Sequence, residues 1–210
     1  MSGSYDFEEQ ERIAAIRHWW EDNAKFVYAA IAATLLAIAG WRGWQYWQVQ
    51  QADDAAAAAA DLAKVRADPK KIGDLAGLLA DRYPKSFEAS EAGLVAARTL
   101  FEAGDLEGAR ARLEWVAKNG REEHRGIARL RLAAVLLDQK KHAEALAALD
   151  ALADPAYAAL AADLKGDVLF AQGRLDEARA AYKLAIDKSD PRSPVKAVTE
   201  VKLGALGGQP

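Results

Sequence analysis

The longest uncharged apolar stretch of the chain runs over residues 26–40, and aromatic residues gather at both of its ends. Five of the six tryptophans lie beside it: Trp19, Trp20, Trp41, Trp44 and Trp47. Indole rings settle where the hydrocarbon of a bilayer meets the headgroups, so two such belts around an uncharged run are typical of a membrane-spanning helix. We therefore predict a transmembrane helix over residues 26–47, with these tryptophans and Arg42 as anchors at the membrane interface.

The length of this segment fits a bilayer only when the flanking aromatic residues are included. Sixteen residues separate Lys25 from Arg42, about 24 Å of helix, whereas a helix of 22 residues through Trp47 reaches about 33 Å. A hydrocarbon core is about 30 Å thick. The alternatives are a buried helix of a soluble domain and a signal peptide cleaved after Ala39. Paired aromatic belts disfavour the first, and the long acidic region before the run disfavours the second, because signal peptides begin with a short positive region.

Basic residues indicate the orientation of the predicted span. Arg12, Arg17 and Lys25 precede the apolar run at 26–40, and only Arg42 follows that run within twenty residues. Cytoplasmic flanks carry the excess of such bases, so we expect residues 1–25 to form a cytoplasmic tail and the chain after the span to be translocated.

The tail carries an amphipathic pattern of its own. Ile13, Ile16 and Trp20 recur at i, i+3 and i+7, which places them on one face of a helix. Such a helix either lies on the cytoplasmic leaflet or contacts a protein partner, and the pattern leaves both open.

The chain after the span has the composition of one all-α domain. Alanine dominates, β-branched runs are absent, and Gly or Pro falls at intervals typical of helix–helix turns. The formal net charge of the whole chain is −3 and no block of Lys or Arg is present, which disfavours nucleic acid as a partner. The absence of cysteine is compatible with an oxidising compartment, and it disfavours a lipoprotein because no residue is available for lipidation.

Three segments of this domain repeat at the period of a helical-hairpin solenoid. Ala109, Ala145 and Ala178 occupy the same place in the segments GDLEGARARL, KKHAEALAAL and GRLDEARAAY, 36 and 33 residues apart. The tetratricopeptide repeat has a period of 34 residues. Small residues recur twelve positions before each anchor, and large ones four positions after it. They are Ala97, Ala133 and Gly166, and Leu113, Leu149 and Tyr182.

The repeats predict an α-solenoid of tetratricopeptide-like helix pairs over residues 48–210, so the fold class is all-α with one N-terminal transmembrane helix. The predicted pairs are 87–102 with 105–118, 122–138 with 141–152, and 157–171 with 174–187. A less regular pair at 49–67 and 71–82 precedes them, and a capping helix at 194–206 follows. Residues 52–66 fit both a stalk that continues the membrane helix and the first solenoid helix, and both can hold at once.

No catalytic or metal-binding constellation is recognisable in the sequence. It has no cysteine, its histidines (His18, His124 and His142) fall in different elements, and no nucleophile elbow or phosphate-binding glycine loop is present. We therefore predict a protein that is not an enzyme and has no cofactor, metal or small-molecule substrate.

A repeat domain of this kind binds partners through its inner surface, which the first helix of each pair supplies. The register assigns to this surface Leu94, Arg98, Phe101, Leu130, Leu137, Asp163, Asp167 and Phe170. The apolar residues suit an extended or helical peptide, and the charged ones suit backbone or charged groups. The alternative is that the leucines and phenylalanines are ordinary core between helices.

The N-terminal part of the chain carries a specific resemblance. An acidic start at residues 5–11 (YDFEEQE), the tract WWEDNAK at 19–25, and a short span that ends in GWRGWQYW at 40–47 precede the repeats. In this order the chain resembles the YfgM family, whose members are called ancillary subunits of the SecYEG translocon of Gram-negative bacteria. The resemblance covers the whole chain, and Ala24, where members often have glycine, is a minor departure.

The resemblance implies a single-pass protein of the cell inner membrane with a cytoplasmic N-terminus and a periplasmic repeat domain. It implies association with the SecYEG translocon and a membrane-anchored periplasmic chaperone of the PpiD type, and transfer of translocated chains to periplasmic chaperones. Negative regulation of an envelope-stress response regulator on the cytoplasmic side is implied as well. The alternative is a structural tetratricopeptide scaffold for another inner-membrane envelope-assembly complex, which would never touch client chains.

Overall fold

Every regular element of residues 3–207, the part of the chain that the computed structural model describes, is helical, as predicted. Side chains are described from residue 11 onward, so those of the acidic start at residues 5–10 lie outside the described residues. The chain divides into two units, Met1–Gln50 and Gln51–Pro210.

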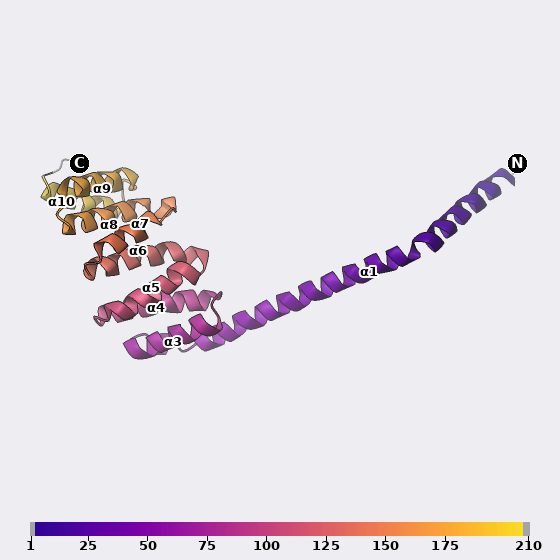
Figure 1. Cartoon of the computed structure of the whole chain (residues 1–210), viewed down its shortest axis with the longest axis horizontal. Helices are drawn as coiled ribbons and strands as arrows, with labels where there is room; N and C mark the ends of the chain where they lie inside the picture. Colours follow the sequence, from indigo (N-terminus) through magenta and orange to yellow (C-terminus); the bar gives the residue numbers. More distant parts are fainter. Residues whose placement is uncertain (1–2, 208–210) are drawn as a thin grey trace. The chain divides into compact units, whose positions relative to one another are not determined.

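Helix α1 (Gly3–Ala59) supplies the whole described part of the first unit (Figure 1). Among the described residues it is the one helix that is long and apolar enough to cross a membrane. Side chains of its apolar run, such as Ile31 and Leu36, are exposed. The run is therefore not a buried core helix, and that alternative is wrong.

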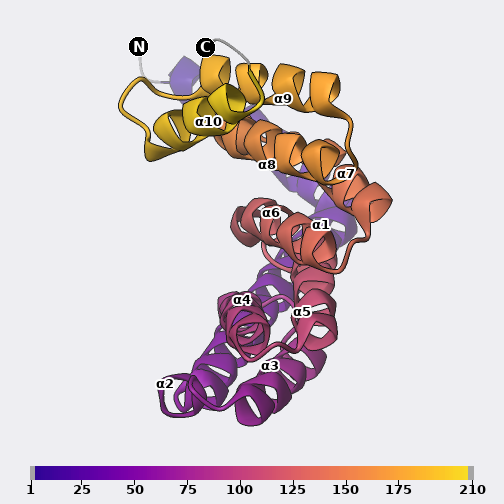
Figure 2. The ribbon, with the colours of Figure 1, turned by 90° about the vertical axis from the view of Figure 1, so that its left-hand side faces the viewer.

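The second unit is a row of helices that pack against one another in chain order (Figure 2). After the end of α1 come α2 (Leu62–Val65), α3 (Pro69–Arg82), α4 (Phe87–Glu102), α5 (Leu106–Asn119), α6 (Glu122–Asp138), α7 (His142–Asp150), η1 (Pro155–Tyr157), α8 (Ala158–Ala171), α9 (Leu175–Lys188) and α10 (Pro194–Ala205). The predicted pairs are α4 with α5, α6 with α7, and α8 with α9. First helices also touch one another, α4 with α6, α6 with α8, and α8 with α10. The predicted solenoid is confirmed.

The repeat positions found in the sequence form the core between paired helices. All nine small and large residues at these positions are buried: Ala97, Ala109, Leu113, Ala133, Ala145, Leu149, Gly166, Ala178 and Tyr182. In the last pair the ring of Tyr182 lies so close to Gly166 that a methyl group on this glycine would overlap it. Small residues on the first helix thus let the second helix approach, which removes apolar side chains from water.

The turn inside each pair repeats one backbone geometry. Gly104, Lys140 and Gly173 all have positive φ, at 83°, 59° and 74°. The next N–H donates back to the first helix in each case. These hydrogen bonds are Asp105 N–H to Leu100 O at 2.8 Å, Lys141 N–H to Leu136 O at 2.8 Å, and Arg174 N–H to Leu169 O at 3.0 Å. They close the helix end as a Schellman motif, for which glycine is the usual residue.

Helix α1 continues into the repeat domain. Ala55 is fully buried in the second unit, and Leu62 and Val65 pack against its core. The solenoid role of residues 52–66 is therefore confirmed, and the stalk role stays a prediction. The predicted helix at 49–67 is interrupted after Ala59, and α2 is a separate short helix.

Candidate partner-binding surfaces

The apolar residues predicted to bind partners differ in how far they reach the surface. Phe101 and Phe170 are 40% and 52% exposed. Leu130 and Leu137 are partly buried against the core. Leu94 is only 6% exposed, so it packs the interior of the repeat and offers little surface to a partner.

Phe101, Leu137 and Phe170 occupy the same place in three successive first helices. Each carbonyl accepts the N–H of the positive-φ residue of its own turn, at 2.9, 2.8 and 2.9 Å respectively. Their side chains therefore leave α4, α6 and α8 at equivalent points, and we call the set the apolar row. Such a row suits the apolar side chains of an extended or helical peptide.

Arg98 lines a cleft of about 620 Å³ between the C-terminal half of α4 and the segment joining α2 to α3. The other lining residues are Ala63, Arg66, Ala67, Pro69, Thr99, Glu102 and Ala103. The Thr99 hydroxyl donates to the backbone oxygen of Arg66 at 3.0 Å, which ties the two walls together.

The chemistry of this cleft comes from its two guanidinium groups. Arg98 is paired with Glu102 at 2.7 Å, but both side chains are exposed, and exposed ion pairs are weak enough to exchange partners. Arg66 and Arg98 can donate to backbone carbonyls or to a carboxylate. The sequence pattern identified Arg98 but not Arg66 or Thr99, because only the folded α2–α3 segment brings them together.

Asp163 and Asp167 are occupied by the last two helices of the domain. Lys202 Nζ lies 2.8 Å from a carboxylate oxygen of each. The Thr199 hydroxyl donates to Asp163 at 2.7 Å, and the Tyr182 hydroxyl donates to Asp167 at 2.8 Å. The two carboxylates thus fasten α10 and α9 to α8, where the sequence analysis placed them on an open binding surface.

The pKa values of Lys202 and Tyr182 show that both groups stay protonated when they donate to the two aspartates. Burial alone would lower the pKa of Lys202, but hydrogen bonds to Asp163 and Asp167 outweigh it and raise the pKa. Burial, and then the hydrogen bond to Asp167, raise the pKa of the Tyr182 phenol. The ammonium and the phenol therefore keep their protons, and so remain donors, at neutral pH.

The predicted membrane anchors are all exposed on α1: Trp19, Trp20, Trp41, Arg42, Trp44 and Trp47. At the start of the apolar run, Trp20 meets Tyr28 edge to face with ring centroids 5.8 Å apart. After the run, the rings of Trp41 and Trp44 lie 5.7 Å apart. Two aromatic clusters therefore flank the run, as an interfacial belt requires.

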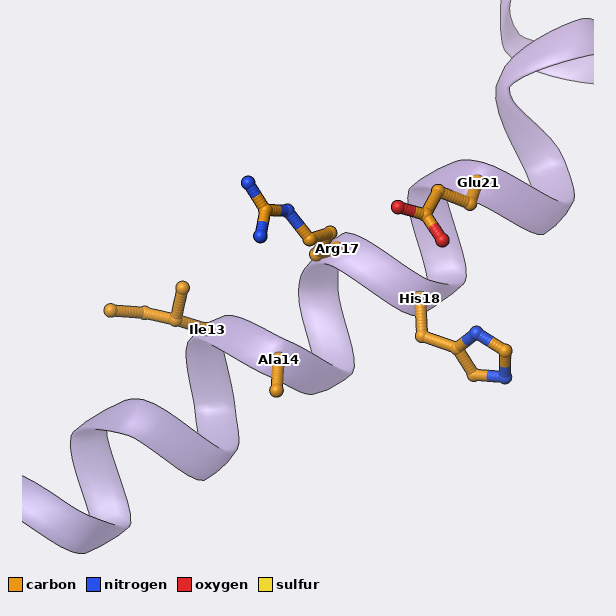
Figure 3. A pocket seen from close by; sticks show the side chains of 5 residues that line it. All are labelled: Ile13, Ala14, Arg17, His18 and Glu21. Atoms are coloured by element: carbon orange, nitrogen blue, oxygen red, sulfur yellow. The ribbon is translucent and has the colours of Figure 1, made fainter.

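The N-terminal part of α1 carries a shallow depression lined by Ile13, Ala14, Arg17, His18 and Glu21 (Figure 3). All five residues come from one helix, so the depression is a groove on a helix surface and does not enclose a ligand. Ile13, Ile16 and Trp20 are exposed, which leaves the predicted apolar face of the tail open to a membrane or a protein. No group of three or more His, Asp or Glu within the described residues is arranged to hold a metal ion.

Comparison with known proteins decides the family. The chain matches the tetratricopeptide repeat-like domain family over residues 17–208. It is 32% identical over 203 residues to a Neisseria gonorrhoeae protein named ancillary SecYEG translocon subunit, covering 95% of this chain and 97% of that protein. The chain belongs to the YfgM family. YfgM-family proteins of the same name from Escherichia coli and Aggregatibacter actinomycetemcomitans are each 28% identical, over 94% and 87% of this chain and 96% and 90% of their own lengths.

Solved structures share the fold of this YfgM-family chain. The MamA RS-1 ArsTM double mutant has a TM-score of 0.56 and 23% identity, covering 75% of this chain and 83% of that one. MamA 41-end from Desulfovibrio magneticus RS-1 has a TM-score of 0.52 and 21% identity, covering 75% and 89%. The family and the single apolar helix of α1 together fit a single-pass membrane protein.

Proposed function

We propose that this chain is a non-enzymatic ancillary subunit of the SecYEG translocon, which holds a binding domain beside chains that emerge from the membrane. The observation that carries the proposal is the apolar row, since Phe101, Leu137 and Phe170 stand at equivalent places on successive first helices. The names of three relatives that match along most of the chain support the translocon as the partner.

The proposed topology is that of the inner membrane. Residues 1–25 lie in the cytoplasm, residues 26–47 span the bilayer, and residues 48–210 form the periplasmic repeat domain. Arg12, Arg17 and Lys25 before the span support this orientation, because basic residues are retained on the cytoplasmic side.

The proposed binding mode joins the apolar row to the arginine cleft. A translocated chain emerges unfolded, with its apolar side chains and backbone carbonyls exposed. The row accepts apolar side chains, and Arg66 and Arg98 donate to carbonyls or carboxylates. Each contact is small and reversible, which suits transfer of the chain to a membrane-anchored periplasmic chaperone of the PpiD type.

The tail has a separate proposed role. Its exposed face of Ile13, Ile16 and Trp20 supports contact with the cytoplasmic leaflet or with a response regulator of envelope stress, which it would restrain.

The test is photocrosslinking in cells with translocation running. A photoreactive residue replaces Phe101 or Phe170, and the matched control replaces Leu184, which is 50% exposed on α9 and lies outside the apolar row. We expect adducts with nascent chains, translocon subunits or the chaperone from Phe101 and Phe170, and not from Leu184. Adducts with one fixed envelope protein that persist when translocation stops would instead favour the structural scaffold.

A further inference from the structure

One wall of the arginine cleft carries a guanidinium group that no described residue neutralises. Within residues 11–207, whose side chains are described, the side chain of Arg66 makes no hydrogen bond or ion pair. The acids nearest to it in the sequence are engaged by lysines, since Asp61 pairs with Lys64 at 2.6 Å and Asp68 with Lys71 at 3.2 Å. Arg66 is therefore available to an anion from outside the domain, in a cleft of about 620 Å³.

The opposite wall shows which kind of anion fits the cleft. Glu102 lines it, and the carboxylate of Glu102 accepts a hydrogen bond from Arg98 Nε at 2.7 Å. The two side chains are 59% and 65% exposed, so the pair contributes little to stability and exchanges readily with another carboxylate. Glu102 is thus a ligand of the cleft supplied by the chain itself. A carboxylate that displaces it would bind Arg98 in addition to Arg66.

The helix end at this cleft favours a peptide over a phosphate group. Glu102 is the last residue of α4 and Ala103 its C-cap, and the last carbonyls of a helix carry partial negative charge and lack partners within the helix. A lipid phosphate would present only acceptor oxygens to these carbonyls. An extended peptide brings N–H donors together with an acidic side chain. A backbone carbonyl, in contrast, is uncharged and competes poorly with the carboxylate of Glu102.

The cleft lies next to the first member of the apolar row. Phe101 is 40% exposed, and it follows Arg98 by three residues on α4, a spacing that places both side chains on one side of the helix. One extended segment can therefore place an apolar side chain on Phe101 and an acidic side chain in the cleft.

We propose that the arginine cleft selects segments with an acidic side chain, Asp or Glu, among the chains that bind along the apolar row. Glu102 occupies Arg98 until such a side chain replaces it, so it sets the selectivity by competition. Segments without an acid leave the ion pair in place and bind through apolar contacts alone. The inference rests on the proposed function, because it names which segments of a translocated chain the domain prefers.

The test measures the binding of two labelled peptides to the full chain in detergent by fluorescence anisotropy. The peptides share one apolar, extended sequence with blocked ends and differ at a single position, which is Glu in one and Gln in the other. We expect the Glu peptide to bind about fivefold more tightly at low salt, and the difference to shrink as salt is added. Arg66→Gln should abolish the difference.

Glu102→Gln gives a readout that a general loss of structure would not give. It removes the competitor, so the Glu peptide should bind about threefold more tightly while the Gln peptide is unaffected. The matched control is Glu114→Gln, which removes an acid paired with Arg110 at the same i, i+4 spacing but outside the cleft. This control should change neither affinity. A gain confined to the Glu peptide excludes partial unfolding, which would alter the binding of both peptides.

Equal affinities of the two peptides, or equal effects of the two Glu→Gln substitutions, would overturn the proposal. A Gln peptide with a free C-terminus that binds as tightly as the Glu peptide would assign the cleft to chain ends instead. Competition by glycerol phosphate as strong as that by the Glu peptide would assign it to lipid headgroups. If the two peptides bind equally while Phe101 and Phe170 still crosslink emerging chains, the selectivity is wrong and the proposed function stands. Loss of those adducts as well would overturn both.

Discussion

The ring of Tyr182 on α9 fills the space beside Gly166 on α8 that a larger side chain would need. The Tyr182 hydroxyl donates a hydrogen bond to Asp167 at 2.8 Å. Gly166→Ala should push the ring off this hydrogen bond and destabilise the fold by about 1–3 kcal/mol. The measurement is denaturant unfolding of the full chain in detergent. The control is Gly73→Ala, which has no atom within 4 Å of the added methyl group and should stabilise the helix by about 1 kcal/mol. Equal effects of the two substitutions would contradict the close approach.

Lys202 and Tyr182 predict a loss of stability at alkaline pH. Folding raises both pKa values above their ordinary 10.5 and 10.0. A group whose pKa is raised on folding contributes stability that is complete below its unfolded pKa and is lost as the pH rises through its folded pKa. We expect the free energy of unfolding to stay level up to about pH 9.5 and to fall above about pH 10. The fall should be shallower in Tyr182→Phe, and an identical profile would count against the network.

The sequence predicted the environment of some residues correctly and of others wrongly. The nine core positions followed from a period alone, because burial between paired helices depends only on spacing within a repeat. Leu94, Asp163 and Asp167 were assigned to an open surface, yet Leu94 lies in the core and α9 and α10 bind the aspartates. The spacing could not show this, because contacts between successive repeats depend on how far each helix is displaced along its neighbour.

Among the elements, the three equivalent turns differ at one position. Lys140 adopts φ of 59° where the other two turns have glycine. A residue with a side chain is destabilised in this conformation by about 1 kcal/mol or more relative to glycine. Glycine gives back part of this advantage, because it has more conformational freedom in the unfolded chain. Lys140→Gly should therefore stabilise the domain by about 0.5 kcal/mol, measured as a rise in the melting temperature. Gly173→Ala should lower it, and a fall in both variants would contradict the shared turn.

The helices themselves were predictable to within a few residues, and the orientation of one of them was not. Gly and Pro at the turns, and alanine between them, fixed the ends of α4 through α9 closely. The outward valines of α10 carried no such signal, since an apolar stripe in a sequence predicts a buried side. In the structure, the burial of Thr199 and Leu203 and the pairing of Lys202 with Asp163 and Asp167 show which side of α10 faces inward.

At the scale of the whole molecule, the absence of native cysteine makes the proposed topology directly measurable. Gln172→Cys lies in the exposed turn between α8 and α9, and His18→Cys lies exposed on the tail. With the outer membrane permeabilised, an impermeant maleimide should label position 172 in intact cells and position 18 only after the inner membrane is broken. The reverse pattern would place the repeat domain in the cytoplasm.

The match of Gly166 to Tyr182 also constrains how such a protein changes over generations. Where the second helix carries leucine, as at Leu113 and Leu149, the first helix carries Ala97 and Ala133; where it carries tyrosine, the first helix carries glycine. A larger residue on one helix is accepted only after its partner has become smaller, so the order of mutations matters. Repeats that drift by such compensated steps keep their shape while their sequences cease to look alike.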